Sequence, residues 1–85
     1  MIEIAFEKVN NRAIAIDNGS IIGECDFLIK DNTWNIVHTV VNSAYQGQGI
    51  ARRLVEIVRE NALKENNHVI ADCSYARKVL DESKQ

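Results

Sequence analysis

In the first half of the chain, four short segments alternate between apolar and polar side chains or are rich in β-branched residues. They lie at residues 2–9, 12–17, 21–29 and 34–41. A period of two is typical of β-strands, because successive side chains point to opposite faces of a sheet. Polar turns separate the segments, and Asn18-Gly19 is the strongest turn signal because both residues tolerate positive φ. We therefore predict an antiparallel meander of four strands.

The second half changes to a period of three to four residues. Apolar side chains recur at this spacing between Ile50 and Ala62, which predicts a helix over residues 49–66 with charged residues on its other side. Arg52 and Glu56 are an opposite-charge pair four residues apart on that charged side, and such pairs favour a helix. A strand, a glycine-containing turn and a helix start are therefore consecutive.

A fifth strand is predicted at residues 68–73, and Ser74 is a good N-cap for a short last helix. The inner face of that helix is expected to consist of Tyr75, Ala76, Val79 and Leu80. A strand, a helix and a strand in sequence form a crossover, so the fifth strand should run parallel to the fourth. The predicted fold class is α/β of the α+β kind: a mixed sheet of about five strands with two helices, in which a meander precedes a β-α-β crossover.

Length and charge narrow the class of protein. Eighty-five residues are enough for one minimal domain, 1–85, with a modest core. The net charge of −2 comes from acids and bases mixed along the chain, which argues against a nucleic-acid or membrane-surface partner. We see neither an apolar run of the ~18 residues that a membrane span needs nor a signal peptide. Cys25 and Cys73 lack metal-ligand spacing, so we expect no metal site and two free thiols in a reducing cytoplasm.

The candidate chemistry centres on the turn Tyr45-Gln46-Gly47-Gln48-Gly49-Ile50-Ala51. The first backbone N–H groups of a helix have no intrahelical partner and lie at the positive end of the helix dipole, so they can bind phosphate oxygens. Gly47 and Gly49 remove two Cβ atoms where a ligand would approach the backbone. The spacing fits neither a P-loop nor a dinucleotide-binding turn, and by itself it is equally compatible with an ordinary turn.

Gln46-x-x-Gly49-x-Ala51 resembles the Gln/Arg-x-x-Gly-x-Gly/Ala signature of the GNAT superfamily of N-acetyltransferases. The chain is similar in two further motifs to a very short, single-domain subgroup of that family. These are a His-Thr pair in the strand before the loop, here His38-Thr39, and a Cys-x-Tyr motif near the end, here Cys73-Ser74-Tyr75. The resemblance runs from about residue 34 to residue 80, and the first half is matched only as a run of strands.

This resemblance implies that acetyl-CoA is the acetyl donor and that the turn cradles the pyrophosphate of coenzyme A. Backbone groups of the preceding strand would pair with the pantetheine arm. Arg52 or Arg53 would reach a phosphate, unless the two arginines only form a solvated helix face. The cofactor-binding residues expected on this basis are Thr39, Val41, Gln46, Gly47, Gln48, Gly49, Ile50, Ala51 and Arg52.

His38 is the candidate general base. Histidine titrates near neutral pH without help and can take a proton from an ammonium group. In the subgroup that the chain resembles, this histidine stands where larger relatives often place a carboxylate. The alternative is a structural histidine that shares a sheet face with Trp34, Ile36 and Val40.

Cys73 and Tyr75 are the other candidate catalytic residues. A thiol at a helix N-terminus has a lowered pKa, so Cys73 suits either an acyl-accepting nucleophile or a residue lining the acetyl pocket, and its alternative is a buried apolar residue. The resemblance implies that Tyr75 protonates the leaving thiolate, and its alternative is a core aromatic residue. We interpret Cys25, within a strand, as a packing residue.

The function implied by the resemblance is transfer of an acetyl group from acetyl-CoA to an amine acceptor, directly or through Cys73. The alternative is a non-catalytic module that binds CoA or a protein partner through an open cleft. Most relatives are longer and have early helices that wall the acceptor site, and the sequence predicts no such helices. We therefore expect a site that is open or is completed by another subunit, in a monomer or weak dimer, with the acceptor left undefined.

Overall fold

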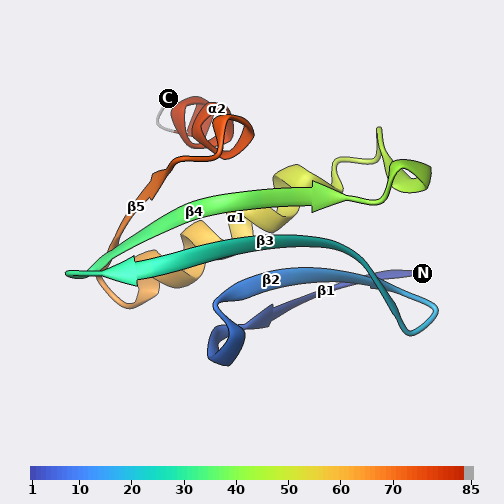
Figure 1. Ribbon diagram of the computed structural model, residues 1–85, viewed down its shortest axis with the longest axis horizontal. Coiled ribbons are helices and arrows are strands. Elements are labelled where there is room, and N and C mark those ends of the chain that lie inside the picture. The colour runs from blue at the N-terminus through green and yellow to red at the C-terminus, as the bar shows by residue number, and fades with distance from the viewer. Residues whose placement is uncertain (84–85) are drawn as a thin grey trace.

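Five strands form one mixed sheet, with a long helix on one of its faces and a short helix beside the last strand (Figure 1). The structure is a computed structural model that describes residues 1–83. The elements are β1 (Ile2–Glu7), β2 (Arg12–Asp17), β3 (Ser20–Lys30), β4 (Thr33–Val41), α1 (Ile50–Lys64), β5 (His68–Ala71) and α2 (Ser74–Ser83), with 3₁₀ turns at Lys8–Asn10 and Ser43–Tyr45. The strands follow one another across the sheet in chain order. The predicted fold class is confirmed.

The meander depends on residues that accept left-handed backbone conformations. Asn18 and Gly19 have φ angles of 50° and 77°, and Asp31 and Asn32 have φ angles of 52° and 62°. Both hairpins therefore turn within two residues, with the twist that suits antiparallel strands. β1 ends earlier than predicted, because Lys8–Asn10 forms a 3₁₀ turn.

β4 and β5 are parallel, as the crossover predicted, but they pair only over residues 33–36 of β4 and 68–71 of β5. Beyond this ladder, the N–H groups of Asp72 and Cys73 both donate to the carbonyl oxygen of Ile36. β5 then ends, while β4 continues to its last residue beside β3 (Figure 1). The two parallel strands thus part at the end of the sheet where β4 leads into the glycine turn.

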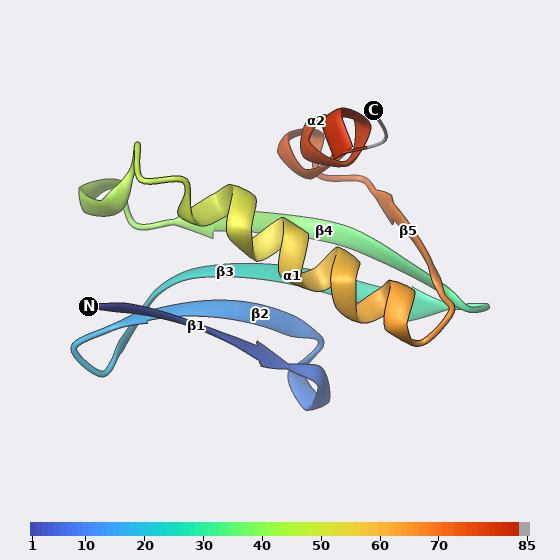
Figure 2. The ribbon, with the colours of Figure 1, turned by 180° about the vertical axis from the view of Figure 1, so that it is seen from behind.

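α1 buries its apolar stripe against the sheet, and Figure 2 shows the helix lying across the strands. The buried residues of the helix are Ile50, Leu54, Val55, Val58 and Ala62. On the sheet, Ala13 and Ala15 are fully buried in the same core, and their small side chains leave room for the helix. Phe27 stacks on Trp34 with the ring centroids 4.5 Å apart, and the Trp34 indole N–H donates to Asn67 Oδ1 at 3.0 Å. This core fixes β4 relative to α1.

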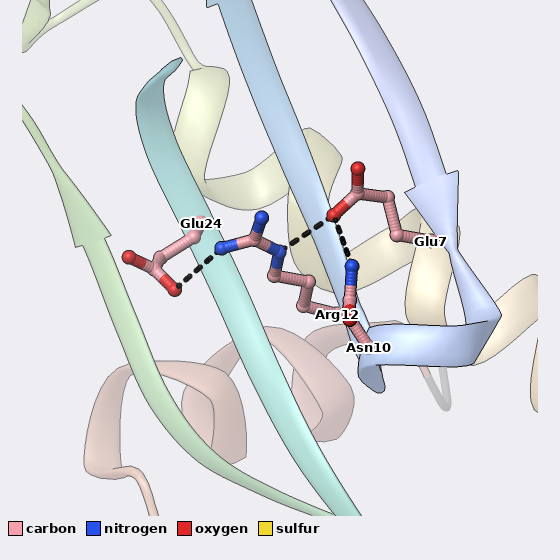
Figure 3. Close-up of polar contacts among 4 residues, drawn as sticks. All are labelled: Glu7, Asn10, Arg12 and Glu24. Carbon is pink, nitrogen blue, oxygen red and sulfur yellow. Dashed lines mark hydrogen bonds and ion pairs between the residues drawn. The ribbon is translucent and has the colours of Figure 1, made fainter.

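The other face of the sheet carries charged side chains that link the first three strands, and both helices lie behind it in Figure 3. Arg12 donates from Nε to Glu7 Oε1 at 2.7 Å, and its Nη1 lies 3.7 Å from Glu24 Oε2. Asn10 also donates to Glu7 Oε1, at 3.3 Å. The hydrogen bond from Arg12 is the main cause of the lowered pKa of Glu7.

None of the described helices is long and apolar enough to cross a membrane.

Candidate functional site

A cavity of about 490 Å³ opens where the end of β4, the glycine turn and the starts of α1 and α2 meet. It is lined by Thr39, Val41, Tyr45, Gln46, Gly47, Gly49, Ile50, Ala51 and Tyr75. Of the residues predicted to contact a cofactor, all but Gln48 and Arg52 are in this lining. The structure thus gathers a strand end, a turn and a helix start around one concave space.

The turn between β4 and α1 has two glycines in a conformation that other residues rarely adopt. Asn42 begins this turn, and its Oδ1 accepts from the Ala44 N–H at 2.9 Å. Gly47 and Gly49 have φ angles of 85° and 76°. A Cβ atom built on either glycine meets no heavy atom within 4 Å. Backbone conformation therefore favours glycine at both positions, and open space in front of them leaves room for a ligand.

The first turn of α1 presents N–H donors that the helix itself does not use. Gly49 is the N-cap and has no side chain to accept from these groups. The helical ladder starts with the bond from Arg53 N–H to the Gly49 carbonyl oxygen at 3.2 Å, so the N–H groups of Ile50, Ala51 and Arg52 precede it. The helix dipole adds roughly half a positive charge at this end. These features suit an anion such as a phosphate.

The side chain of Arg52 joins the two helices and does not line the cavity. Its Nη2 donates to Oε1 of Glu82 in α2. This hydrogen bond is the main cause that raises the pKa of Arg52 and lowers the pKa of Glu82. The ion pair is thus made between helices, whereas the charge pattern predicted Glu56 as the partner.

A β-bulge determines which way the side chains at the end of β4 point. Ile36 and His38 pair with consecutive residues of β3, so Val37 is an extra residue in β4. The bulge reverses the alternation, so Thr39 points to the core side as Ile36 does, while His38 and Val40 are exposed. The alternative in which His38 shares a face with the buried residues of β4 is therefore wrong.

His38 lies opposite Asp26 of β3, on the sheet face away from α1. Burial is the main cause that raises the pKa of Asp26 to about 6; the neighbouring Glu24 carboxyl adds to the rise, and His38 opposes it. His38 is therefore not brought into the cavity lining with Thr39. It has an acidic neighbour instead, which no local sequence pattern indicates, because Asp26 lies on a different strand.

The raised pKa of Asp26 predicts that the free energy of unfolding decreases as the pH rises from about 4 to about 6. An unfolded aspartate titrates near ~3.9, so the folded state, with a pKa of about 6, binds this proton more tightly. This contribution is fully present below the unfolded pKa and is lost as the pH rises through the folded pKa. Urea unfolding of wild type and Asp26→Asn across this range checks the prediction, because the variant should lack this decrease. An equal decrease in both proteins would assign it to other groups.

Cys73, rather than the predicted Ser74, is the N-cap of α2. The first helical bond runs from the Arg77 N–H to the Cys73 carbonyl oxygen at 2.9 Å, and the helix begins at the next residue. Burial alone would raise the pKa of the Cys73 thiol. Hydrogen bonds from the Ala76 N–H and the Thr39 hydroxyl outweigh this effect, so the pKa of Cys73 is lowered.

Two tyrosines line the cavity. Tyr75 is 40% exposed, so its predicted place on the inner face of α2 is wrong. The other three predicted inner-face residues, Ala76, Val79 and Leu80, are buried.

The Tyr45 hydroxyl donates to Asp17 Oδ2 at 2.5 Å, and Asp17 Oδ1 lies 3.4 Å from the N-terminal amine of Met1. No local sequence pattern indicates Asp17 as the partner of Tyr45, because the two residues are 28 positions apart.

Among the candidate catalytic residues, Tyr75 lines the cavity together with the glycine turn. Cys73 is not in this lining, and His38 lies on the other face of the sheet. Cys73 contacts the lining residue Thr39, with 3.6 Å between Sγ and Oγ1. Cys25 is fully buried, in agreement with a packing residue. Within residues 1–83, no cluster of three or more His, Cys, Asp or Glu side chains is placed to hold a metal ion.

Comparison with known proteins gives one family. A family model described as GCN5-related N-acetyl-transferase matches residues 11–85. The solution structure of a GCN5-like protein from Staphylococcus aureus is 30% identical, with a TM-score of 0.73, and the match covers 96% of this chain and 80% of that one. A chain of the NatC complex bound to Gag peptide and CoA is 28% identical, with a TM-score of 0.63, and the match covers 85% of this chain and 55% of that one. No curated protein sequence matches significantly.

A longer structural relative shows how much of the fold is shared. A GCN5-related N-acetyltransferase from Sphaerobacter thermophilus is 22% identical, with a TM-score of 0.68. The match covers 73% of this chain but 21% of that one. This chain therefore shares its fold with about a fifth of the larger protein.

Proposed function

This chain belongs to the GCN5-related N-acetyltransferase family, and we propose that it binds acetyl-CoA at the glycine turn and transfers the acetyl group to an amine. The observation that carries the proposal is the N-terminus of α1, which has a glycine N-cap, opens onto the cavity and leaves its first N–H groups without a helical partner. The NatC relative, whose structure contains CoA, supports the same ligand.

The residues around the turn fit a phosphate-bearing ligand. The N–H groups of Ile50 and Ala51 would hold pyrophosphate oxygens, and the open space before Gly47 and Gly49 would admit them. β4 extends beyond its pairing with β5, so backbone groups near Thr39 would pair with the pantetheine arm. Arg52 would reach a phosphate only after leaving Glu82, and we therefore assign it a minor part in binding.

For the chemical step we propose that Cys73 accepts the acetyl group. Its thiolate attacks the thioester carbonyl carbon, and the C–S bond to coenzyme A breaks as the bond to Cys73 Sγ forms. Tyr75, which lines the cavity, would give its proton to the leaving thiolate. The acceptor amine then attacks the acetyl group on Cys73 and releases the Cys73 thiolate, and the proton that the amine nitrogen loses on forming the amide would return to the Tyr75 phenolate through solvent.

His38 is the base that we propose for the acceptor amine. Because His38 lies on the sheet face away from α1, the amine would approach from that face, near the point where β4 and β5 part. There the ammonium group would meet the exposed imidazole and the carboxyl of Asp26 opposite it. His38→Ala should then slow transfer to the amine more than it slows acetylation of Cys73.

The direct test is a titration with CoA and acetyl-CoA followed by intact mass analysis and by release of free thiol. The proposal expects amide shifts at residues 46–51, one added acetyl group and, with an amine present, continuous release of CoA. Binding without an adduct or turnover would identify the alternative, a non-catalytic CoA-binding module. No shift at these amides would reject the cofactor site itself.

Tyr45→Phe should weaken CoA binding about fivefold to tenfold, because it removes the hydrogen bond that ties the turn to Asp17. The phenyl ring would still line the cavity, so the loss reports the hydroxyl alone. Calorimetric titration of both proteins checks the value. Asp17→Asn is the matched control, because its amide oxygen can still accept from Tyr45 and should preserve most of the affinity. Equal affinity of Tyr45→Phe and wild type would contradict this role.

A further inference from the structure

A threonine hydroxyl joins two thiols across the end of the sheet. Thr39 Oγ1 lies 3.6 Å from Cys25 Sγ on β3 and 3.6 Å from Cys73 Sγ at the start of α2. Cys25 is fully buried, Cys73 is half-buried, and both are free thiols. Thr39 also lines the cavity. Its hydroxyl therefore connects a thiol in the core to a thiol at the proposed site.

Building on the acetyl transfer proposed above, we propose that Thr39 and Cys25 are positioning residues that stabilise the Cys73 thiolate through a hydrogen-bond chain whose direction reverses on ionisation. With Cys73 protonated, its S–H donates to Thr39 Oγ1, and the Thr39 hydroxyl donates to Cys25 Sγ. When Cys73 loses its proton, the Thr39 hydroxyl donates to the thiolate, and the Cys25 S–H donates to Thr39 Oγ1. A hydroxyl has one hydrogen and two acceptor lone pairs, so both arrangements satisfy it.

Cys25 can reverse its role because it keeps its proton. Burial is the main cause that raises the pKa of Cys25 to about 12. Hydrogen bonds to backbone N–H groups and to Thr39 lower the pKa of Cys73 despite its partial burial. The proton therefore leaves Cys73 first, and Cys25 remains a donor for the hydroxyl.

The charged groups near this chain of hydrogen bonds have other partners or lie on the other face of the sheet. They are Arg77, Asp72, Asp26 and His38. Arg77 directs its Nε–H to the Ala71 carbonyl oxygen at 3.2 Å, and the Asp72 carboxylate accepts from a side-chain amide at 2.9 Å. Asp26 and His38 face each other across strands on the exposed face. From the sheet, the Thr39 hydroxyl thus contacts the sulfur of Cys73.

Thr39→Val tests the hydrogen-bond chain, because valine keeps the shape of threonine and removes the hydroxyl. The measurement is the rate of Cys73 alkylation by iodoacetamide as a function of pH, followed by peptide mass analysis without acetyl-CoA. We expect about threefold to tenfold slower alkylation at pH 7 and a midpoint moved to higher pH, since a hydrogen bond to a charged group is lost. Thr39→Ser should restore the wild-type profile. Cys25→Ala should move the midpoint less, in the same direction.

An unchanged midpoint in Thr39→Val, with the wild-type circular dichroism spectrum retained, would overturn the proposal. If the midpoint of the pH profile is unchanged in Cys25→Ala, Cys25 does not belong to the hydrogen-bond chain. The thiol measurement needs no CoA, so it is independent of the proposed function. If wild type fails to bind CoA while Thr39→Val still raises the midpoint, the proposed function fails and the hydrogen-bond chain stands.

Discussion

Replacing Gly49 with Asp is expected to weaken CoA binding about tenfold to a hundredfold while leaving the fold intact. The substitution puts a carboxylate at the N-terminus of α1, where the proposal places the pyrophosphate. A tenfold to hundredfold loss is ~1.4–2.7 kcal/mol, which is the size of the repulsion between two like charges a few ångströms apart in a partly exposed site. Gly49 has a φ angle of 76° and open space around it. Aspartate tolerates this left-handed region better than a β-branched residue would.

Two control variants separate charge from backbone strain. Gly49→Asn has the same size and the same tolerance for positive φ but no charge, so it should lose much less affinity. Gly19→Asp introduces the same side chain at a similar φ angle of 77°, also with no heavy atom within 4 Å, at a glycine outside the cavity lining. It should keep wild-type affinity. Equal affinity of Gly49→Asp and wild type would place the anion site elsewhere.

Most of the fold could be predicted because its signals are local. The Asn18-Gly19 turn specifies one hairpin by backbone conformation alone. The helix stripe that begins at Ile50 fixes which side of α1 meets the sheet. The parallel pairing of β4 and β5 follows from their connection through α1. Each of these features depends on residues close together in the chain or on the order of elements.

The details of the site could be predicted only in part, because they depend on pairing between distant strands. The bulge at Val37 turns His38 away from the face of Thr39, and no alternation of apolar residues indicates where a bulge falls. The contact between Tyr45 and Asp17 joins the turn to the end of β2. The glycine turn itself could be predicted, because positive φ angles such as those of Gly47 and Gly49 favour glycine in the sequence.

The candidate thiol and the candidate base lie on different faces of the sheet. Their roles can therefore be tested separately, by substitution of one residue at a time. Cys73 caps α2 and contacts Thr39 within the core side of the sheet. His38 is exposed beside Asp26. An acetyl group held on Cys73 would lie near the end of β4, where β5 no longer covers that strand. Acetyl-CoA and the acceptor amine would then approach from opposite faces of the sheet, and the acetyl group on Cys73 would be transferred to the amine where β4 and β5 part.

Cys73→Ala is accordingly expected to abolish the acetyl adduct and to slow acetyl transfer to an amine by at least about a hundredfold, because the nucleophile is removed. The adduct on wild type should be one acetyl group on Cys73, labile to hydroxylamine, and Cys25→Ala should still form it. The substitution leaves the backbone of the N-cap in place, so CoA binding at the turn should persist, which calorimetry can verify. If Cys73→Ala transfers acetyl groups to the amine at the wild-type rate, Cys73 lines the pocket and the amine attacks the thioester directly. The lowered pKa of Cys73 would then be a consequence of its hydrogen bonds at the start of α2 and would have no role in the reaction.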